Sequence, residues 1–425
     1  MGRTHLLGLG LVALAATFAA CSASDGGGAE FGDDDDTSTG GAGTAAGTGG
    51  NPADGDLDDD GLDPTSVGGS TSSGGTTCVT DPAVDDDLDG LSEDAGDCND
   101  CDPNAHPGSI EVIATADSGS GGAGGGSGSG GAPAAADEDC DGMVDNIAPP
   151  CDAGLTLEDS DPNNAARAVD LCQSATGLKW GVVSSNYVRA DGTVTAASAQ
   201  TGIFDTFGAN VVPQGGERML SISSGRSRRP GDPNPCGGPS CQEIGGGTPP
   251  PGFPQDTSGC PGAGNINDDA GVQITIRTPK NATGYSFNFK FYSFEYPEWL
   301  CQLYNDQFIS LVTPPPMGSI DGNISFDSAN NPVSVNVAFF DVCDGCPAGS
   351  AEMIGTGFNE WDDAGGTSWL QTTAPVTGGE EITIRWAIWD TFDDVFDSTT
   401  LIDNWQWVAT GGTPVVGTEP VPDPK

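Results

Sequence analysis

Aspartates in a repeated pattern are the side chains of this sequence best suited to bind a ligand. The pattern Asp-x-Asp-x-Asp-Gly occurs at residues 56–61, 85–90 and 137–142. Alternate aspartates place several carboxylate oxygens around one point, and the glycine permits the sharp turn that follows, as in the first half of an EF-hand calcium loop. Hard oxygen ligands of this kind favour calcium, and a solvated acidic linker is the alternative.

A further acid must close each loop. In the second copy this acid is Asp97 or Glu93, and in the third copy it is Asp145. The first copy has only Asp63 before Pro64, which favours a solvated linker there. The predicted metal ligands are Asp85, Asp87, Asp89, Glu93, Asp97, Asp137, Asp139, Asp141 and Asp145.

The same segments resemble a metal-binding motif of bacterial surface proteins. That motif runs from an Asp-rich loop through D-C-D-D and P-G-x-x-E to D-C-D-G, and this chain carries a Gly/Ser insert where the family has a short link. Some relatives are linked to copper, but one histidine and no methionine cluster make a poor soft-ligand set. The matching positions are Asp97, Cys98, Asp100, Asp102, Pro107, Gly108, Glu111, Asp139, Cys140, Asp141 and Gly142.

Histidine is nearly absent from the sequence. His5 lies in the N-terminal segment and His106 in an acidic loop. Ser-His-Asp, Cys-His and histidine-zinc hydrolysis all need an imidazole beside the reacting group. We therefore expect no histidine-based catalysis and interpret the chain as a non-enzyme, with a carboxylate-dependent glycoside hydrolase as the enzymatic alternative.

The N-terminal segment has the organisation of an export signal. Arg3 precedes an apolar run over residues 6–20, and small residues lead into Cys21. The run is too short for a membrane span, so we expect residues 1–20 to be a signal peptide. Its ending resembles a bacterial lipobox, with Phe18 in place of the usual leucine. The resemblance implies lipidation of Cys21 in an outer-membrane lipoprotein facing outward, and an ordinary secretory signal is the alternative.

Acidic residues dominate the composition, with 62 Asp and Glu against 13 Lys and Arg and a formal charge of -49. Such a surface repels nucleic acid and anionic headgroups, so we expect calcium ions as partners, no nucleic acid, and membrane contact only through the lipid anchor. Arg226, Arg228 and Arg229 form the one basic cluster. Their Gly, Ser and Pro neighbours predict a solvated loop, with anion binding as the alternative.

Low-complexity segments separate the parts of the chain. Residues 21–80 contain scarcely a large apolar side chain, so they cannot offset their ordering entropy and are predicted to be a disordered tether. An O-glycosylated stalk would have the same mechanical role. Residues 118–131 form a Gly/Ser insert within the Asp-rich region of residues 81–160, and residues 411–425 are predicted to be a disordered tail.

Of the 13 cysteines, all but Cys21 lie beyond the signal segment, which leaves an even number. In an exported chain this predicts disulfides, although spacing does not define their pairing. The C-x-x-C pairs at residues 98–101 and 343–346 are also compatible with zinc, which an oxidising compartment disfavours.

From residue 161 the pattern changes to that of a β protein. A short helix is expected from Asp161–Pro162, a favourable cap, to about Ser174. Period-2 runs bounded by Gly, Pro, Asn and Asp then predict antiparallel sheets with one buried face, that is, a mainly β, jelly-roll-like sandwich over residues 161–410. The expected strands cover residues 180–188, 272–277, 287–291, 307–313, 323–326, 333–337, 381–389 and 400–407.

This region resembles the choice-of-anchor L domain of bacterial surface proteins. The resemblance covers about residues 163–410 and is most specific in E-Y-P-E at residues 295–298, followed by Asn305-Asp306. It implies an exported surface location and a β-rich fold, with no established reaction. The Cys-rich loop of residues 230–262 looks like an addition to the family pattern.

Acidic residues also gather at the expected strand ends. They are interpreted as solvated loop acids, as ligands of a structural calcium, or as a glycoside acid/base pair of Glu295 with Asp397. Trp299 is the aromatic side chain chosen as a ligand-binding platform, against the alternative that it belongs to the core. The second metal site would use Glu295, Asp306, Asp397 and Asp403.

These features together predict a tethered, calcium-binding surface lipoprotein that presents a β-sandwich. Its expected work is adhesion, to a polysaccharide or to a surface protein. The second alternative, which is also not an enzyme, is a purely structural component of the envelope.

Overall fold

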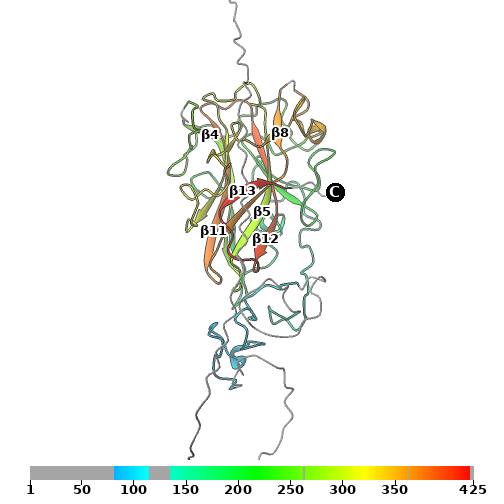
Figure 1. Ribbon diagram of the computed structural model, residues 1–425. Helices are drawn as coiled ribbons and strands as arrows, with labels where there is room; N and C mark the ends of the chain where they lie inside the picture. The colour runs from blue at the N-terminus through cyan, green and yellow to red at the C-terminus, as the bar shows by residue number, and fades with distance from the viewer. Residues whose placement is uncertain (1–80, 114–134, 262–263, 362, 422–425) are drawn as a thin grey trace, which may run out of the picture. The chain divides into compact units, whose positions relative to one another are not determined.

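The computed structural model describes residues 81–113, 135–261, 264–361 and 363–421 (Figure 1). The expected signal peptide, Cys21, the tether, the first aspartate copy and the Gly/Ser insert lie outside these ranges. Within the described residues, no helix is both long and apolar enough to cross a membrane.

One sheet contains five strands, which pair antiparallel in the order β1-β4-β11-β6-β7. Except for β6 and β7, neighbours in this sheet are far apart in the sequence, as Figure 1 shows for β4 beside β11. The strands are β1 (Gly181–Val188), β4 (Ile266–Arg277), β6 (Gln307–Thr313), β7 (Val333–Ser334) and β11 (Glu381–Thr391).

The second sheet has the order β13-β10-β5-β12-β3-β2, with β9 also pairing β5 and β8 pairing β9. Its central strands β5 and β12 lie side by side in Figure 1. The strands are β2 (Thr201–Phe204), β3 (Met219–Ser223), β5 (Gly284–Ser293), β8 (Phe340–Val342), β9 (Gly365–Thr367), β10 (Leu370–Pro375), β12 (Ser398–Val408) and β13 (Gly417–Pro420).

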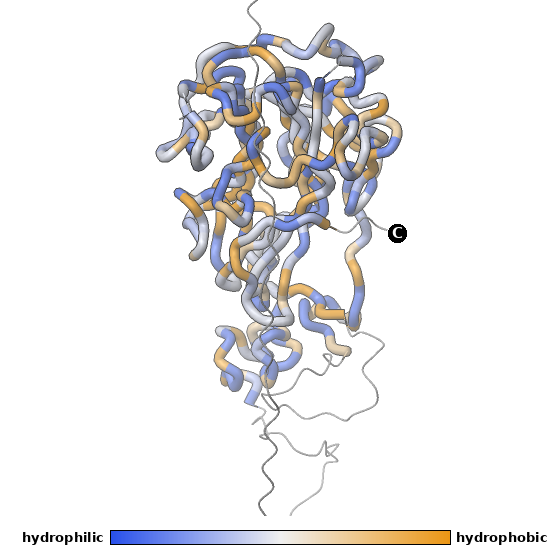
Figure 2. The backbone as a smooth tube through the Cα atoms, turned by 45° about the horizontal axis from the view of Figure 1, so that its top comes forward, coloured by the Kyte–Doolittle hydropathy of each residue, from blue (hydrophilic) through white to orange (hydrophobic). Residues whose placement is uncertain are grey.

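Aromatic side chains join the two sheets into a sandwich. Phe287 of β5 meets Trp386 of β11 edge to face, with ring centroids 5.4 Å apart, and Phe289 meets Phe308 of β6 at 5.2 Å. Such pairs contribute about 0.5–1.5 kcal/mol each beyond the area they bury. In Figure 2 hydrophobic stretches run through the strands of this sandwich.

Long loops bury the outer faces as well. Over the second sheet, Phe207, Met353 and Phe358 pack on Tyr292 and Leu401 in a second hydrophobic cluster. A third, smaller cluster covers the first sheet with Phe253 against Trp389. Because of this double cover, all ten residues of β5 are buried, where the sequence predicted one buried face.

The predicted mainly β, antiparallel fold in two sheets is confirmed, with corrections to single elements. Helix α1 (Pro162–Arg167) begins as expected, with the Asp161 carboxylate accepting from the Asn163 N–H, but it ends before Ser174. Residues 323–326 form only isolated bridges. The short helices η1 (Glu93–Ala95) and η2 (Ala351–Met353), and β2, β3 and β10, were not predicted.

The C-terminal segment is also corrected. Residues 411–425 were expected to be disordered, but β13 pairs with β10, and the Val421 N–H donates to the Trp369 carbonyl. A hydrogen bond between the hydroxyls of Thr372 and Thr418, both buried, fixes the register. The edge of the second sheet thus provides hydrogen-bonding partners that the segment's composition does not reveal.

The predicted disulfides are present among the described residues. Both C-x-x-C motifs contribute a sulfur to a disulfide, which argues against the zinc alternative. The pairs within the described residues include Cys98–Cys140, Cys151–Cys172, Cys236–Cys241, Cys260–Cys301 and Cys343–Cys346.

Candidate metal centre

The two described aspartate loops share one local geometry. In the loop of residues 85–90, Asp85 Oδ2 accepts a hydrogen bond from the Gly90 N–H at 3.0 Å. In the loop of residues 137–142, Asp137 Oδ2 accepts from the Gly142 N–H at 2.9 Å. Each first aspartate therefore closes its loop onto the glycine five residues later.

The two aspartate loops also have similar backbone dihedrals. The fourth residues, Leu88 and Cys140, have φ values of 66° and 57°, and the glycines Gly90 and Gly142 have 106° and 91°. A glycine adopts such a dihedral without the cost that a β-carbon imposes. The repeated sequence is thus a repeated structure.

Carboxylates gather tightly around the first loop. Ligand atoms of Asp87, Asp89 and Asp97 all lie within 4.8 Å of one another, as do those of Asp85, Asp87 and Asp100. Of the two predicted closing acids, Asp97 is the one that lies among the aspartates of the loop. The other predicted closing acid, Glu93, is exposed in η1.

Burial makes this cluster unusual. Asp89 and Asp97 are only 6 % and 5 % exposed, and Oδ2 of each is buried without a hydrogen-bond partner, as is Oδ2 of Asp87. Burial raises the pKa of Asp97 to about 6, and the nearby charges of Asp89 and Asp87 act in the same direction. Buried carboxylates need a partner, and a hard cation fits unpartnered oxygens.

Around the second loop the acids are arranged differently. Asp139 and Asp141 accept hydrogen bonds from the loop's own backbone, and Asp145 lies with Glu111 and Glu138 in a group whose ligand atoms fall within 4.8 Å. Burial raises the pKa of Glu111 and of Glu138. These two glutamates were not among the predicted ligands, although the resemblance to the metal-binding motif included Glu111.

A disulfide fastens the two loops together. Cys98 directly follows Asp97, and its partner Cys140 is the fourth residue of the second loop. The His106 N–H also donates to the Glu138 carbonyl at 2.7 Å. The Gly/Ser insert therefore does not separate the two halves of the aspartate motif.

The predicted second metal site is only partly assembled. The Asp306 N–H donates to Glu295 Oε2 at 3.3 Å, so these two residues meet. Asp403 instead accepts hydrogen bonds from the Gln214 and Gly215 N–H groups, with Asp170 as its acidic neighbour. Asp403 therefore belongs to a different part of the sandwich.

Asp397 lies between the interior acids and a cavity. Its carboxylate accepts from the Cys241 N–H at 2.9 Å, and burial raises its pKa to about 8. Because Asp397 is 3 % and Glu295 1 % exposed, the two acids lack the access to substrate that a glycosidase pair needs. The geometry thus does not favour the glycosidase alternative.

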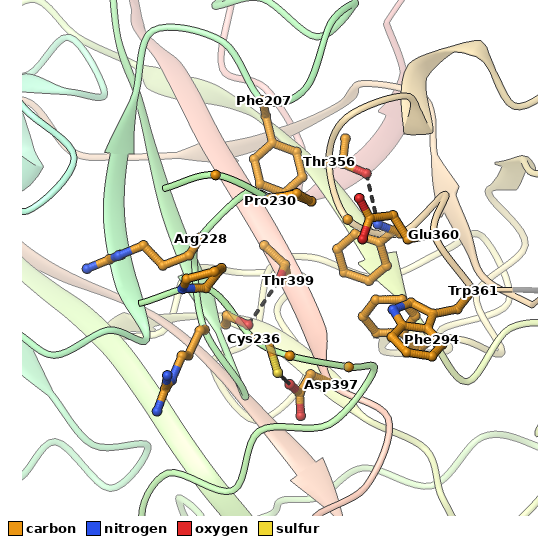
Figure 3. Close-up of a pocket in the computed structure, with 18 residues that line it drawn as sticks. Phe207, Arg228, Pro230, Cys236, Phe294, Thr356, Glu360, Trp361, Asp397 and Thr399 are labelled. Carbon is orange, nitrogen blue, oxygen red and sulfur yellow. Dashed lines mark hydrogen bonds between the residues drawn. The ribbon is translucent and has the colours of Figure 1, made fainter. Parts of the chain in front are cut away.

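Trp299 is half-buried in an aromatic group rather than displayed alone. It meets Tyr304 edge to face at 5.0 Å and lies 6.2 Å from Phe396. A more open tryptophan, Trp361, is 44 % exposed and borders a cavity of about 300 Å³. Figure 3 shows Phe294 and Trp361 on one side of this cavity and Asp397 below them.

The basic cluster is not a solvated loop. Arg226 pairs with Glu243, and Arg229 pairs with Asp232 and lies over the Phe204 ring. Arg228 is half-buried and donates to the Thr201 carbonyl at 2.8 Å, while burial lowers its pKa. In Figure 3 its guanidinium points away from the cavity. These arginines fasten loops to the second sheet.

Comparisons with known proteins give one result. No curated protein and no solved structure matches the chain. Residues 257–405, which contain the E-Y-P-E segment and the interior acids, match the family model described as Choice-of-anchor L domain. The resemblance seen in the sequence is confirmed for residues 257–405, which are similar to the Choice-of-anchor L domain.

Proposed function

We propose that this chain is an exported, calcium-binding protein of the bacterial cell surface, lipid-anchored through Cys21, that presents its sandwich for adhesion. The Choice-of-anchor L domain indicates a surface-associated bacterial protein. Calcium, the lipid anchor and adhesion to a polysaccharide or a surface protein are parts of the proposal.

One observation carries the calcium assignment: buried carboxylate oxygens converge without a partner. Oδ2 atoms of Asp87, Asp89 and Asp97 are shielded from solvent and accept no hydrogen bond. Oxygen atoms at this density suit calcium, which takes six to eight oxygen ligands in flexible geometry. A merely solvated acidic linker would keep its carboxylates in water.

Calcium at this position would stabilise the region around it. The ion would neutralise like charges that otherwise repel, and the Cys98–Cys140 disulfide would link the first loop to the second. Lys280, which precedes β5, donates from Nζ to the Asp89 carbonyl at 2.6 Å. Ion binding at the first loop is therefore connected to the sandwich by a direct contact.

The cavity beside Trp361 is our candidate for the adhesive ligand site. Phe294 and Phe358 stack within 4.3 Å of each other in its wall, and the exposed Glu360 adds a carboxylate. Aromatic faces with nearby hydrogen-bonding groups suit a sugar ring. We therefore propose Trp361, in place of Trp299, as the aromatic side chain that stacks on a saccharide. If no saccharide binds, a purely structural role is the alternative.

Calcium titration of the full chain by calorimetry tests the proposal. We expect binding with a dissociation constant on the order of 10 μM, weakened at least tenfold by Asp89→Asn. Asp94→Asn is the matched control, because Asp94 is an exposed acid of the same segment. Absence of binding heat in the unmodified chain, or equal loss in both variants, would refute the calcium assignment.

A further inference from the structure

Three acidic side chains meet inside the sandwich, apart from the aspartate loops. Glu295 follows β5, Asp306 precedes β6, and Asp390 belongs to β11. They are 1 %, 1 % and 0 % exposed. Segments distant in the sequence thus bring three carboxyl groups into the interior of the Choice-of-anchor L domain.

Strand register explains how they meet. Trp389 of β11 pairs with Gln307 of β6, so the continued antiparallel register places Asp390 opposite Asp306. On its other edge, β11 has an irregularity against β4 between Ile388 and Asp390. Bulges of this kind redirect a side chain and are frequent beside functional sites.

Asp306 connects the three elements through hydrogen bonds. Its Oδ1 accepts from the Thr391 N–H at 3.1 Å, and its Oδ2 accepts from the Ser398 hydroxyl at 2.7 Å. Its own N–H donates to Glu295 Oε2 at 3.3 Å. The carboxyl group of Asp306 is therefore held from β11 and β12, and its backbone is held by the segment after β5.

The carboxyl oxygens of Asp390 and one of those of Glu295 lack hydrogen bonds like those of Asp306. Both carboxyl oxygens of Asp390 and Oε1 of Glu295 are buried without a well-formed hydrogen bond, and the polar groups nearest Asp390 are the Ser224 hydroxyl and the Asp306 carboxyl group. Among the described residues, no ion pair with Lys or Arg involves any of the three acids. The charged neighbours that influence Glu295 and Asp390 are all acidic, including Asp393 and Asp397.

Three carboxylates buried together without a cation are strongly unfavourable. Asparagine or glutamine would supply hydrogen bonds without charge, so packing does not explain three acids. We infer that Glu295, Asp306 and Asp390 hold a buried calcium ion that fastens β6, β11 and the segment after β5 together. The donors are all hard oxygens, and magnesium, which retains several waters, suits a fully buried position less well.

The ion at this site should exchange with solvent more slowly than ions at the aspartate loops. Ions at the loops should equilibrate with a chelator, whereas an ion enclosed by β6, β11 and β12 should stay until the sandwich opens. The inference extends the calcium proposal to a second position without depending on it.

Metal analysis of the full chain tests the inference. After folding in calcium and exhaustive dialysis against EGTA, we expect one calcium per chain by plasma mass spectrometry. Asp390→Asn should lose this ion, and Asp89→Asn should keep it. Asp403→Asn is the matched control, because it alters a buried carboxylate outside the trio and should retain the ion.

Two outcomes would overturn the inference. One is the absence of chelator-resistant calcium in the unmodified chain. The other is a retained ion of another kind, sodium or magnesium, that Asp390→Asn does not remove. If Asp390→Asn fails to fold, Glu295→Gln is measured in its place, and the metal content of the unmodified chain still decides.

Discussion

The Asp-rich region and the sandwich bury opposite kinds of side chain. In the sandwich, aromatic and aliphatic residues such as Phe287 and Trp386 are fully enclosed. In the described residues between 81 and 150, Ala105 is the one buried apolar residue, while Leu88 is 84 % and Ile147 is 78 % exposed. The buried positions of this region belong instead to acids such as Asp97.

This inversion shows what stabilises each part. Apolar burial gives the sandwich a favourable free energy without any ligand. The Asp-rich region gains little from apolar burial, so its stability depends on the disulfide and, in our proposal, on a bound cation.

The largest effect should come from opening the sandwich core. Trp386→Ala removes a fully buried indole and should lower the free energy of unfolding of the sandwich by about 3–5 kcal/mol. Urea unfolding followed by tryptophan fluorescence measures this loss. Calcium affinity at the aspartate loops should stay within twofold of the unmodified chain, and a larger change would contradict the comparison.

Removing the disulfide between the loops should have the next largest effect. The Cys98→Ser/Cys140→Ser double variant opens a link across a sequence separation of 42 residues, worth about 3–4 kcal/mol. Limited proteolysis should cut residues 81–145 much faster while the sandwich stays intact. The Cys343→Ser/Cys346→Ser variant is the control, and equal protection of the Asp-rich region in both variants would contradict the prediction.

Acid should weaken calcium binding at the first loop. Because the pKa of Asp97 is raised to about 6, the metal-free folded state keeps a proton that the unfolded state releases near pH 4. That proton stabilises the metal-free fold at low pH, and the contribution is lost as the pH rises through about 6. Calcium must displace it, so affinity should fall up to about tenfold per pH unit below pH 6.

Calorimetric titrations at pH 5.0, 6.0 and 7.5 measure this dependence. The Asp97→Asn variant should bind more weakly and show a flatter pH profile. An affinity independent of pH in the unmodified chain would contradict the assigned role of Asp97.

The smallest effect concerns the contact between the two parts. Lys280→Ala removes the hydrogen bond to the Asp89 carbonyl, worth about 1 kcal/mol. Calcium should then raise the melting temperature of the sandwich by less than it does in the unmodified chain. An unchanged calcium effect in Lys280→Ala would show that the two parts respond independently.

Local sequence predicted what depends on neighbours along the chain. The alternation of Val272, Ile274 and Ile276 indicated a strand, and these residues lie in β4. The Asp-x-Asp-x-Asp-Gly spacing indicated two turns whose geometry the structure shows to be equal. The strands β2 and β3 were missed because they are short and buried at every position, so they show no alternation.

Other features depend on contacts between distant segments. Asp390 joins Glu295 and Asp306 only through the register of β11 on β6, which the sequence does not display. Asp403 was predicted to share a metal site with Glu295 and Asp306, yet it accepts hydrogen bonds from the Gln214 segment. Residue type predicted the chemistry, and pairing between strands decided which acids share a site.

Hydrogen exchange of the full chain, with and without calcium at pH 7.5, tests the central claim most directly. The account predicts that EGTA removes amide protection from residues 85–97 and 137–145 while β5 and β11 keep theirs. Equal protection of the aspartate loops with and without calcium would contradict the claim that a metal ion stabilises the Asp-rich region.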